Sequence, residues 1–351
     1  MGIIRLLLAV AVVSVHTKGG ISIFPFFGNS GVTPVMMFYA ISGFYMAMVI
    51  NEKYAEDTIY FYKKRALRLM PVYWIILIPT ILLALLYTVF VNPISLFSSV
   101  LNEADLLKSA SILLLNVFPV GADMVSLSTM ESGGTSSGLY FTPVIWSIGS
   151  EITFYLLSPF FIRSRARTII VFAVFVSVRI GVYALYDFQW TPWLYFFPAA
   201  TFPFFIMGAL AYQWLRPIAK RVTKALDTKL LFKVLALSIF PVLIVMHQWL
   251  PLNDTVLIVL FALTIPTLFE LTKTNRFDRM IGELSYPLYI AHSAVILFWA
   301  PFRHVLPVEA KFIWVLTAGI LVSLIALKAE ALILRTIRTS RQSKNAVQAH
   351  K

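Results

Sequence analysis

The chain has 351 residues, of which 59% are hydrophobic and only 13% are charged, and its mean hydropathy is +0.83. A soluble domain carries about 25% charged residues, so this composition excludes an ordinary soluble protein. The chain contains no cysteine, which excludes disulfides, thiolate metal sites and a cysteine nucleophile. Its formal net charge of +13 makes the location of the cations informative.

Apolar runs recur along the chain at a length that suits membrane spans, which need about 20 apolar residues each. They predict an all-α integral membrane protein with about ten transmembrane helices and with both termini in the cytoplasm. We expect one membrane domain over residues 1–335 and a basic cytoplasmic tail over residues 336–351. The predicted spans are residues 3–18, 31–50, 70–91, 143–162, 168–186, 196–215, 230–248, 254–272, 281–302 and 312–334.

Two segments have more than one interpretation. Residues 92–142 form the one long loop, predicted to be extracytoplasmic, and within it Ser109–Val120 is apolar but too short to span, so we expect an interfacial or re-entrant piece. The first span begins with Arg5 and an apolar run, which also resembles a secretory signal peptide. The motif that includes His16, described below, favours a retained helix.

The basic residues settle the predicted orientation. With ten spans and a cytoplasmic N-terminus, 22 Lys and Arg residues fall on the cytoplasmic side. Four fall on the other side, namely Lys18, Lys108, Arg303 and Lys311. Such an excess is the main signature of cytoplasmic segments. The positive charge is therefore explained by topology, and nucleic acid is not an expected partner.

Four ionisable residues lie deep in the predicted spans, namely His16, Glu151, Arg179 and His292. Such groups are costly in a membrane unless they are paired or line a hydrated cavity, so they are functional candidates. At 1.5 Å per residue all four fall at mid-membrane or in the outer half. Interhelical hydrogen bonds are the structural alternative for the two histidines. For Glu151, pairing with Arg179 and orienting His16 both remain open.

Five stretches in this order resemble the membrane acyltransferase family 3, which O-acylates bacterial surface and secreted glycans. They are Arg5-LLLAVAVVSV-His16, Phe38-YAISGFYM with Ser42, Arg65-AL-Arg68-LMPVY, Trp146-SIGS-Glu151-ITFY, and Gly282-ELS-Tyr286-PLYIA-His292. The resemblance covers residues 5–292 and departs from the family pattern only slightly, as at Gly149-Ser150. It implies a cytoplasmic acyl-CoA donor, most simply acetyl-CoA, and a glycan or lipid-linked glycan acceptor.

The residues suggest roles within that reaction. Arg65 and Arg68 are three apart and share a helix face, so we expect them, with Arg5, to hold the phosphates of CoA. Arg5 and His16 are separated by about 16 Å along a helix, which is comparable to a pantetheine arm. His16 is then the general base or an acyl-carrying nucleophile, with Glu151 as a second catalytic candidate.

The remaining candidates are assigned to substrate binding. They are Ser42, Trp146, Arg179, Tyr286 and His292. No metal is expected. The predicted location is the bacterial inner membrane, with membrane lipids and polysaccharide-biosynthesis proteins as partners.

Two other classes compete with this interpretation. A transporter or glycan-lipid flippase explains the spans and the buried charges, but not an arginine pair at the distance of a CoA arm from a histidine. A glycan polymerase or ligase usually has a larger outer loop rich in Arg and His, and residues 92–142 contain neither.

The orientation is testable with reporters that are active only in the cytoplasm. A reporter fused after Lys351 should be active, and one inserted at Gly133 should be silent, because the charge excess places these positions on opposite sides. The measurement is reporter activity per fusion protein in the membrane fraction. Activity at both positions would contradict the ten-span arrangement.

Overall fold

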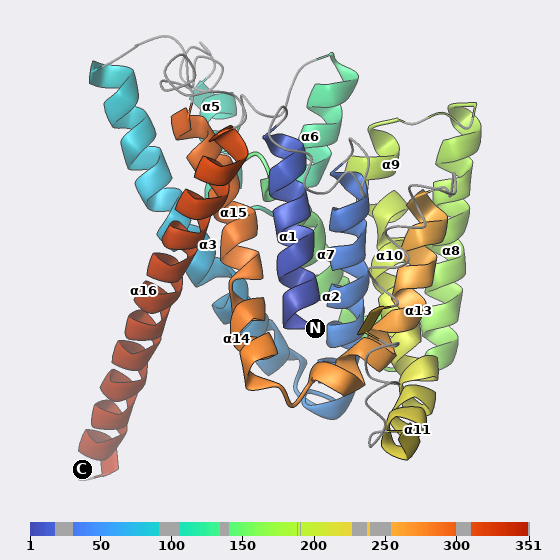
Figure 1. The fold of residues 1–351 in the computed structure, drawn as a ribbon. Helices are drawn as coiled ribbons and strands as arrows, with labels where there is room; N and C mark the ends of the chain where they lie inside the picture. The colour runs from blue at the N-terminus through green and yellow to red at the C-terminus, as the bar shows by residue number, and fades with distance from the viewer. Residues whose placement is uncertain are drawn as a thin grey trace.

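The computed structural model describes residues 1–17, 31–90, 106–133, 140–187, 189, 191–226, 237–238, 254–299 and 310–349, and the described residues contain helices and no strand. Figure 1 shows α1 and α2 near the centre of the helical assembly, with α16 and α8 on opposite sides. The helices are α1 Gly2–His16, α2 Val32–Glu52, α3 Thr58–Phe90, α5 Leu106–Val117, α6 Ala122–Glu131, α7 Ile145–Phe161, α8 Arg165–Leu185, α9 Trp193–Phe196, α10 Pro198–Leu210, the π-helix η3 Ala211–Leu215, α11 Arg216–Leu226, α13 Asp254–Thr272, α14 Arg276–Glu283, α15 Ser285–Trp299 and α16 Ala310–Ala349.

Six helical segments are long and apolar enough to cross a membrane: Val32–Glu52, Thr58–Leu86, Arg165–Leu185, Asp254–Thr272, Arg276–Phe298 and Ala310–Thr336. Three further predicted spans coincide with shorter helices, α1, α7 and α10. The predicted span 230–248 lies outside the described residues except at 237–238. The chain is therefore a multi-pass helical protein, and ten spans remain a prediction. The predicted basic tail continues α16 as helix as far as Ala349.

The predicted loop 92–142 contains two helices where one short piece was expected. Helix α5 matches that piece, and α6 follows it after Gly121, whose φ of 87° lies in the left-handed region that glycine tolerates best. The carbonyl of Asn116 accepts a hydrogen bond from the hydroxyl of Tyr73 on α3. Trp74 Nε1 donates to the carbonyl of Val117 at 2.9 Å. These bonds attach the loop helices to α3.

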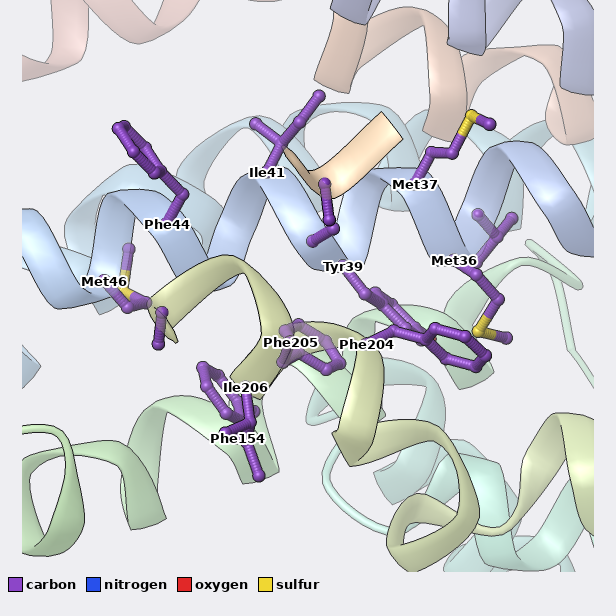
Figure 2. Close-up of a cluster of buried hydrophobic side chains, with 14 of the residues drawn as sticks. Met36, Met37, Tyr39, Ile41, Phe44, Met46, Phe154, Phe204, Phe205 and Ile206 are labelled. Carbon is purple, nitrogen blue, oxygen red and sulfur yellow. The ribbon is translucent and has the colours of Figure 1, made fainter. Parts of the chain in front are cut away.

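Helices α2 and α10 pack closely against each other through two glycines. An added Cβ would lie 1.7 Å from the carbonyl oxygen of Phe205 at Gly43, and 1.8 Å from that of Ala40 at Gly208. Close backbone approach through small residues is how membrane helices gain packing energy without a hydrophobic driving force. Phe205 beside this contact also stacks on Phe154 of α7, and Figure 2 shows this buried cluster. The pair therefore fixes α2 and, with it, Ser42.

The N-terminal end of α1 is capped by a residue far along the chain. Asp278 accepts hydrogen bonds from the backbone N–H of Gly2 at 2.7 Å and of Ile3 at 3.0 Å. A carboxylate satisfies the unpaired N–H groups of a helix start and also interacts favourably with the helix dipole. Gly2 packs against Gly282 so closely that a Cβ at Gly282 would lie 2.6 Å from the Gly2 Cα. These contacts set the height of Arg5, one turn farther along α1.

We predict that Gly43→Ala destabilises the protein, because the new methyl group meets the α10 backbone and overpacking typically costs about 1–3 kcal/mol. Gly181→Ala is the matched control, since nothing lies within 4 Å of a Cβ there. Removing a helix glycine at that open position should be neutral or stabilising. The measurement is the thermal midpoint of both purified variants. Equal midpoints would contradict the assigned contact between α2 and α10.

Candidate active site

A single cavity of about 850 Å³ brings most of the predicted site residues together. Its lining comes from α1, α2, α3, α7, α13, α14, α15 and α16. Along α2 it reaches from Val35, near one end of the helix, to Lys53 just past the other. These positions are 18 residues apart, or about 27 Å along a helix axis. The cavity is therefore long enough to run through most of a bilayer's hydrocarbon core of about 30 Å.

Three arginines gather toward one end of this cavity. Arg5 of α1 and Arg65 and Arg68 of α3 all line it, and Arg68 lies within electrostatic range of both others. Among the described residues none of the three makes an ion pair with a carboxylate. The Nε atom of Arg65 is buried and has no hydrogen-bond partner there. Unpaired guanidinium groups at a cavity wall are suited to binding an anion, and their planar fork suits phosphate.

Glu151 also lines the cavity, and two hydroxyl groups hold its carboxylate. Ser42 Oγ donates to Glu151 Oε1 at 2.5 Å, and the hydroxyl of Tyr155 donates to the same oxygen. Glu151 lies within electrostatic range of Arg5 and Arg65 without contacting either. These two donors satisfy part of the hydrogen-bonding capacity of this half-buried carboxylate. Ser42 is thus a partner of Glu151 in this structure.

Two tyrosines of α15 form another wall. Tyr286 donates its hydroxyl to the carbonyl of Leu69 at 3.0 Å, which ties α15 to α3 beside Arg68. Tyr289 shares a hydrogen bond with Ser147 Oγ of α7 at 2.7 Å. The ring of Tyr289 also lies 5.9 Å from the ring of His292. Tyr289 lines the cavity, whereas His16 and His292 do not, so Tyr289 connects the cavity wall with the histidines.

His16 and His292 form a pair outside the cavity lining, with His292 about one helical turn beyond Tyr289 on α15. The distance between His16 Nδ1 and His292 Nε2 is 2.9 Å, and the two rings are nearly parallel at an interplanar angle of 11°. His292 is completely buried, whereas His16 is exposed. One of the two nitrogens must carry the shared proton. When it is His16 Nδ1, the other nitrogen of His16, Nε2, is left with the lone pair that a base requires.

Trp146 and Arg179 do not line the cavity, contrary to what a shared pocket would require. Trp146 packs against Tyr195 and Phe196 at ring distances of 4.3 and 4.9 Å. The guanidinium of Arg179 donates to the carbonyls of Leu194 and Ala200 at 2.9 and 2.8 Å. No ion pair joins Arg179 to Glu151 within the part of the chain that the structure describes. Both side chains hold the turn between α9 and α10.

Sequence reasoning missed three residues of the site, Tyr155, Asp278 and Tyr289. Tyr155 and Tyr289 stand inside the quoted motifs, four residues after Glu151 and three before His292, which is the helical spacing of neighbouring side chains. Asp278 carried no such signal, because its partner is the start of α1. The described residues contain no group of three or more side chains arranged to hold a metal ion.

Arg179→Gln should lower the thermal midpoint by several degrees, because it removes hydrogen bonds from a charged group, each worth about 1.5–3 kcal/mol. Acyl-transfer turnover per folded molecule should stay within about twofold of the unchanged protein, since Arg179 lies outside the cavity. Thermal unfolding and turnover would be measured on the same preparation. A large rise in KM at unchanged stability would contradict this prediction and show that Arg179 takes part in substrate binding.

The comparisons with known proteins agree with the motifs. A family model described as an acyltransferase domain, Acyl_transf_3, matches residues 1–327, which include every residue of the cavity except Glu330, Ala331 and Leu334. No curated protein and no solved structure matched the chain. The chain belongs to the acyltransferase 3 family and is a membrane acyltransferase.

Proposed function

We propose that the protein is an O-acyltransferase of the bacterial inner membrane, which moves an acyl group, most simply acetyl, from cytoplasmic acyl-CoA to a hydroxyl of a cell-envelope or exported glycan. The observation that carries this proposal is the cavity itself. It has unpaired arginines toward one end and stops about one helical turn from a histidine pair at the other. Its volume of about 850 Å³ falls within the usual range of ligand pockets, about 300–1,000 Å³.

The three arginines determine which way the acyl-CoA donor lies in the cavity. With the diphosphate of CoA held by Arg5, Arg65 and Arg68, the pantetheine arm extends along α1 and α2. The thioester then lies near Tyr289, on the way from Arg5 to His16, which is about 16 Å from Arg5 along α1. Transfer requires a small opening beside Tyr289, because Tyr289 lines the cavity and the two histidines do not. Glu151 balances the arginine charge while the donor site is empty.

The histidine pair supplies the proton transfer. His16 Nε2 takes the proton of the acceptor hydroxyl as its oxygen bonds to the thioester carbon. The carbon–sulfur bond then breaks, and His16 returns the proton to the leaving sulfur, so that the products are the ester and free CoA. Nε2 of buried His292 accepts a hydrogen bond from the Nδ1–H of His16 throughout. It thereby fixes the tautomer and the orientation of the His16 ring, which is the orienting role that the third member of a catalytic triad has.

Replacing both Arg65 and Arg68 with Ala should raise KM for acetyl-CoA at least tenfold, because each charged hydrogen bond is worth about 1.5–3 kcal/mol. Lysine at both positions should restore only part of this, since it lacks the planar fork. Lys63→Ala is the control, because Lys63 is exposed on the same helix and does not line the cavity. The phosphate role would be abandoned if the folded double variant kept its KM.

His16→Ala should lower turnover by about 10²–10⁴-fold while acetyl-CoA binding is retained, since the arginines lie about 16 Å away. His292→Leu should also lower turnover. His292→Gln should keep much of the turnover, because the Gln side-chain carbonyl still accepts a hydrogen bond from the Nδ1–H of His16. Turnover per folded molecule and CoA binding would be measured together. Near-normal turnover of His16→Ala would remove it from the chemistry, and a trapped acyl-enzyme would show that it acts as a nucleophile.

A further inference from the structure

The cavity has a second set of cations beyond the three arginines, here called the rim cations: Lys53, Lys273 and Arg279. Lys53 follows α2, Lys273 follows α13, and Arg279 is on α14. All three are exposed, as expected at the open end of the cavity. The rim cations come from α14 and from the residues that follow α2 and α13, whereas the three arginines are on α1 and α3. The cavity lining therefore carries two sets of cations from different elements.

Two of the three rim cations, Lys273 and Arg279, are held in place before any ligand binds. Arg279 Nη2 donates to the backbone carbonyl of Lys273 at 3.2 Å. The ammonium of Lys273 pairs with Glu270, whose carboxylate also accepts from Arg216 Nε at 3.1 Å. Neither Glu270 nor Arg216 lines the cavity. This network ties the rim to α11 and α13 and lowers the entropy that the side chains lose on binding an anion.

The charge at this end of the cavity is uneven. Glu330 of α16 and Glu283, the last residue of α14, also line the cavity, and they lie within electrostatic range of each other. Figure 1 shows α13 and α16 on opposite sides of α1 and α2. An anion at the mouth is therefore drawn to the rim cations and repelled by the α16 side. Asp278 does not neutralise the rim, because its carboxylate caps α1.

The anionic groups of CoA occur in two places. The diphosphate links the pantetheine arm to the ribose, and a separate phosphomonoester sits on the ribose 3′ oxygen, on the side away from the thioester. We propose that Lys53, Lys273 and Arg279 form a subsite for the 3′-phosphate of the donor, an assignment that rests on the proposed function. The subsite makes the enzyme select CoA thioesters over thioesters of dephospho-CoA or of a carrier protein's phosphopantetheine, both of which lack this phosphate.

The expected difference in affinity follows from the charge of the 3′-phosphate. A phosphomonoester carries about −1.5 to −2 charges near pH 7 and offers three acceptor oxygens. Loss of one charged hydrogen bond is worth about tenfold in affinity or more. Dephospho-CoA should therefore bind at least about tenfold more weakly than CoA. The three arginines serve both ligands equally, because both contain the diphosphate.

The test compares binding of CoA and 3′-dephospho-CoA to the full chain in nanodiscs of phosphatidylcholine, a lipid without net charge that does not compete for the rim. Lys53→Gln combined with Arg279→Gln should bring CoA affinity down to that of dephospho-CoA and leave dephospho-CoA unchanged. Arg65→Gln should weaken both ligands alike. Arg276→Gln is the matched control, since Arg276 is exposed on α14 and outside the cavity lining, and it should change neither.

Thermal unfolding of each variant would confirm that it is folded, and Arg279→Lys, which keeps the charge, should retain part of the preference for CoA. Equal binding of the two ligands by the unchanged protein would overturn the subsite and leave the acyltransferase proposal intact. A rim variant that weakened both ligands equally would also overturn it, by showing general electrostatic attraction. Failure of the folded, unchanged protein to bind either ligand would overturn both proposals.

Discussion

Arg5, Arg65 and Arg68 share one cavity without a carboxylate at ion-pair distance among the described residues, and the surrounding structure holds them there. Asp278 caps α1 below Arg5, while Tyr286 ties α15 to the backbone of α3 beside Arg68. Ser42 and Tyr155 engage the carboxylate of Glu151, so it stays near the arginines without pairing. Cations in a membrane protein are costly unless they are paired or hydrated, so the protein gives up stability at this site in favour of binding an anion.

Helix α2 contributes both to helix packing and to the candidate site. Gly43 permits close contact with α10, and Ser42 beside it faces Glu151, so the S-G-F stretch combines a structural and a chemical requirement. The same holds at Gly282, which lets α14 approach α1, and at Tyr286 and His292 on the helix that follows. Residues close together in the sequence thus lie near the two ends of the site. The reason is that one membrane helix is about as long as the distance between the donor's phosphates and its thioester.

The sequence predicted the helical class, and six of the ten predicted site residues line the cavity. Helical spacing gives depth along a span but not the direction in which a side chain points, and so Arg179 and Trp146 were expected in the site and lie outside the cavity. Lys53, Lys273 and Arg279 look like ordinary cytoplasmic charge until the fold places them on one rim. The pairing of His16 with His292 joins positions 276 residues apart, which no local pattern can reveal.

The most direct test of the account uses proteoliposomes and acetyl-CoA labelled differently in the acetyl group and in the nucleotide. The donor is supplied on the side of Lys53, and envelope polysaccharide fractions are placed on the other side. We expect the acetyl label to appear in polysaccharide only when the protein is present, while the nucleotide label remains on the side of Lys53. Passage of both labels together would indicate a transporter, and absence of acetyl transfer to every fraction by folded protein would contradict the proposed reaction.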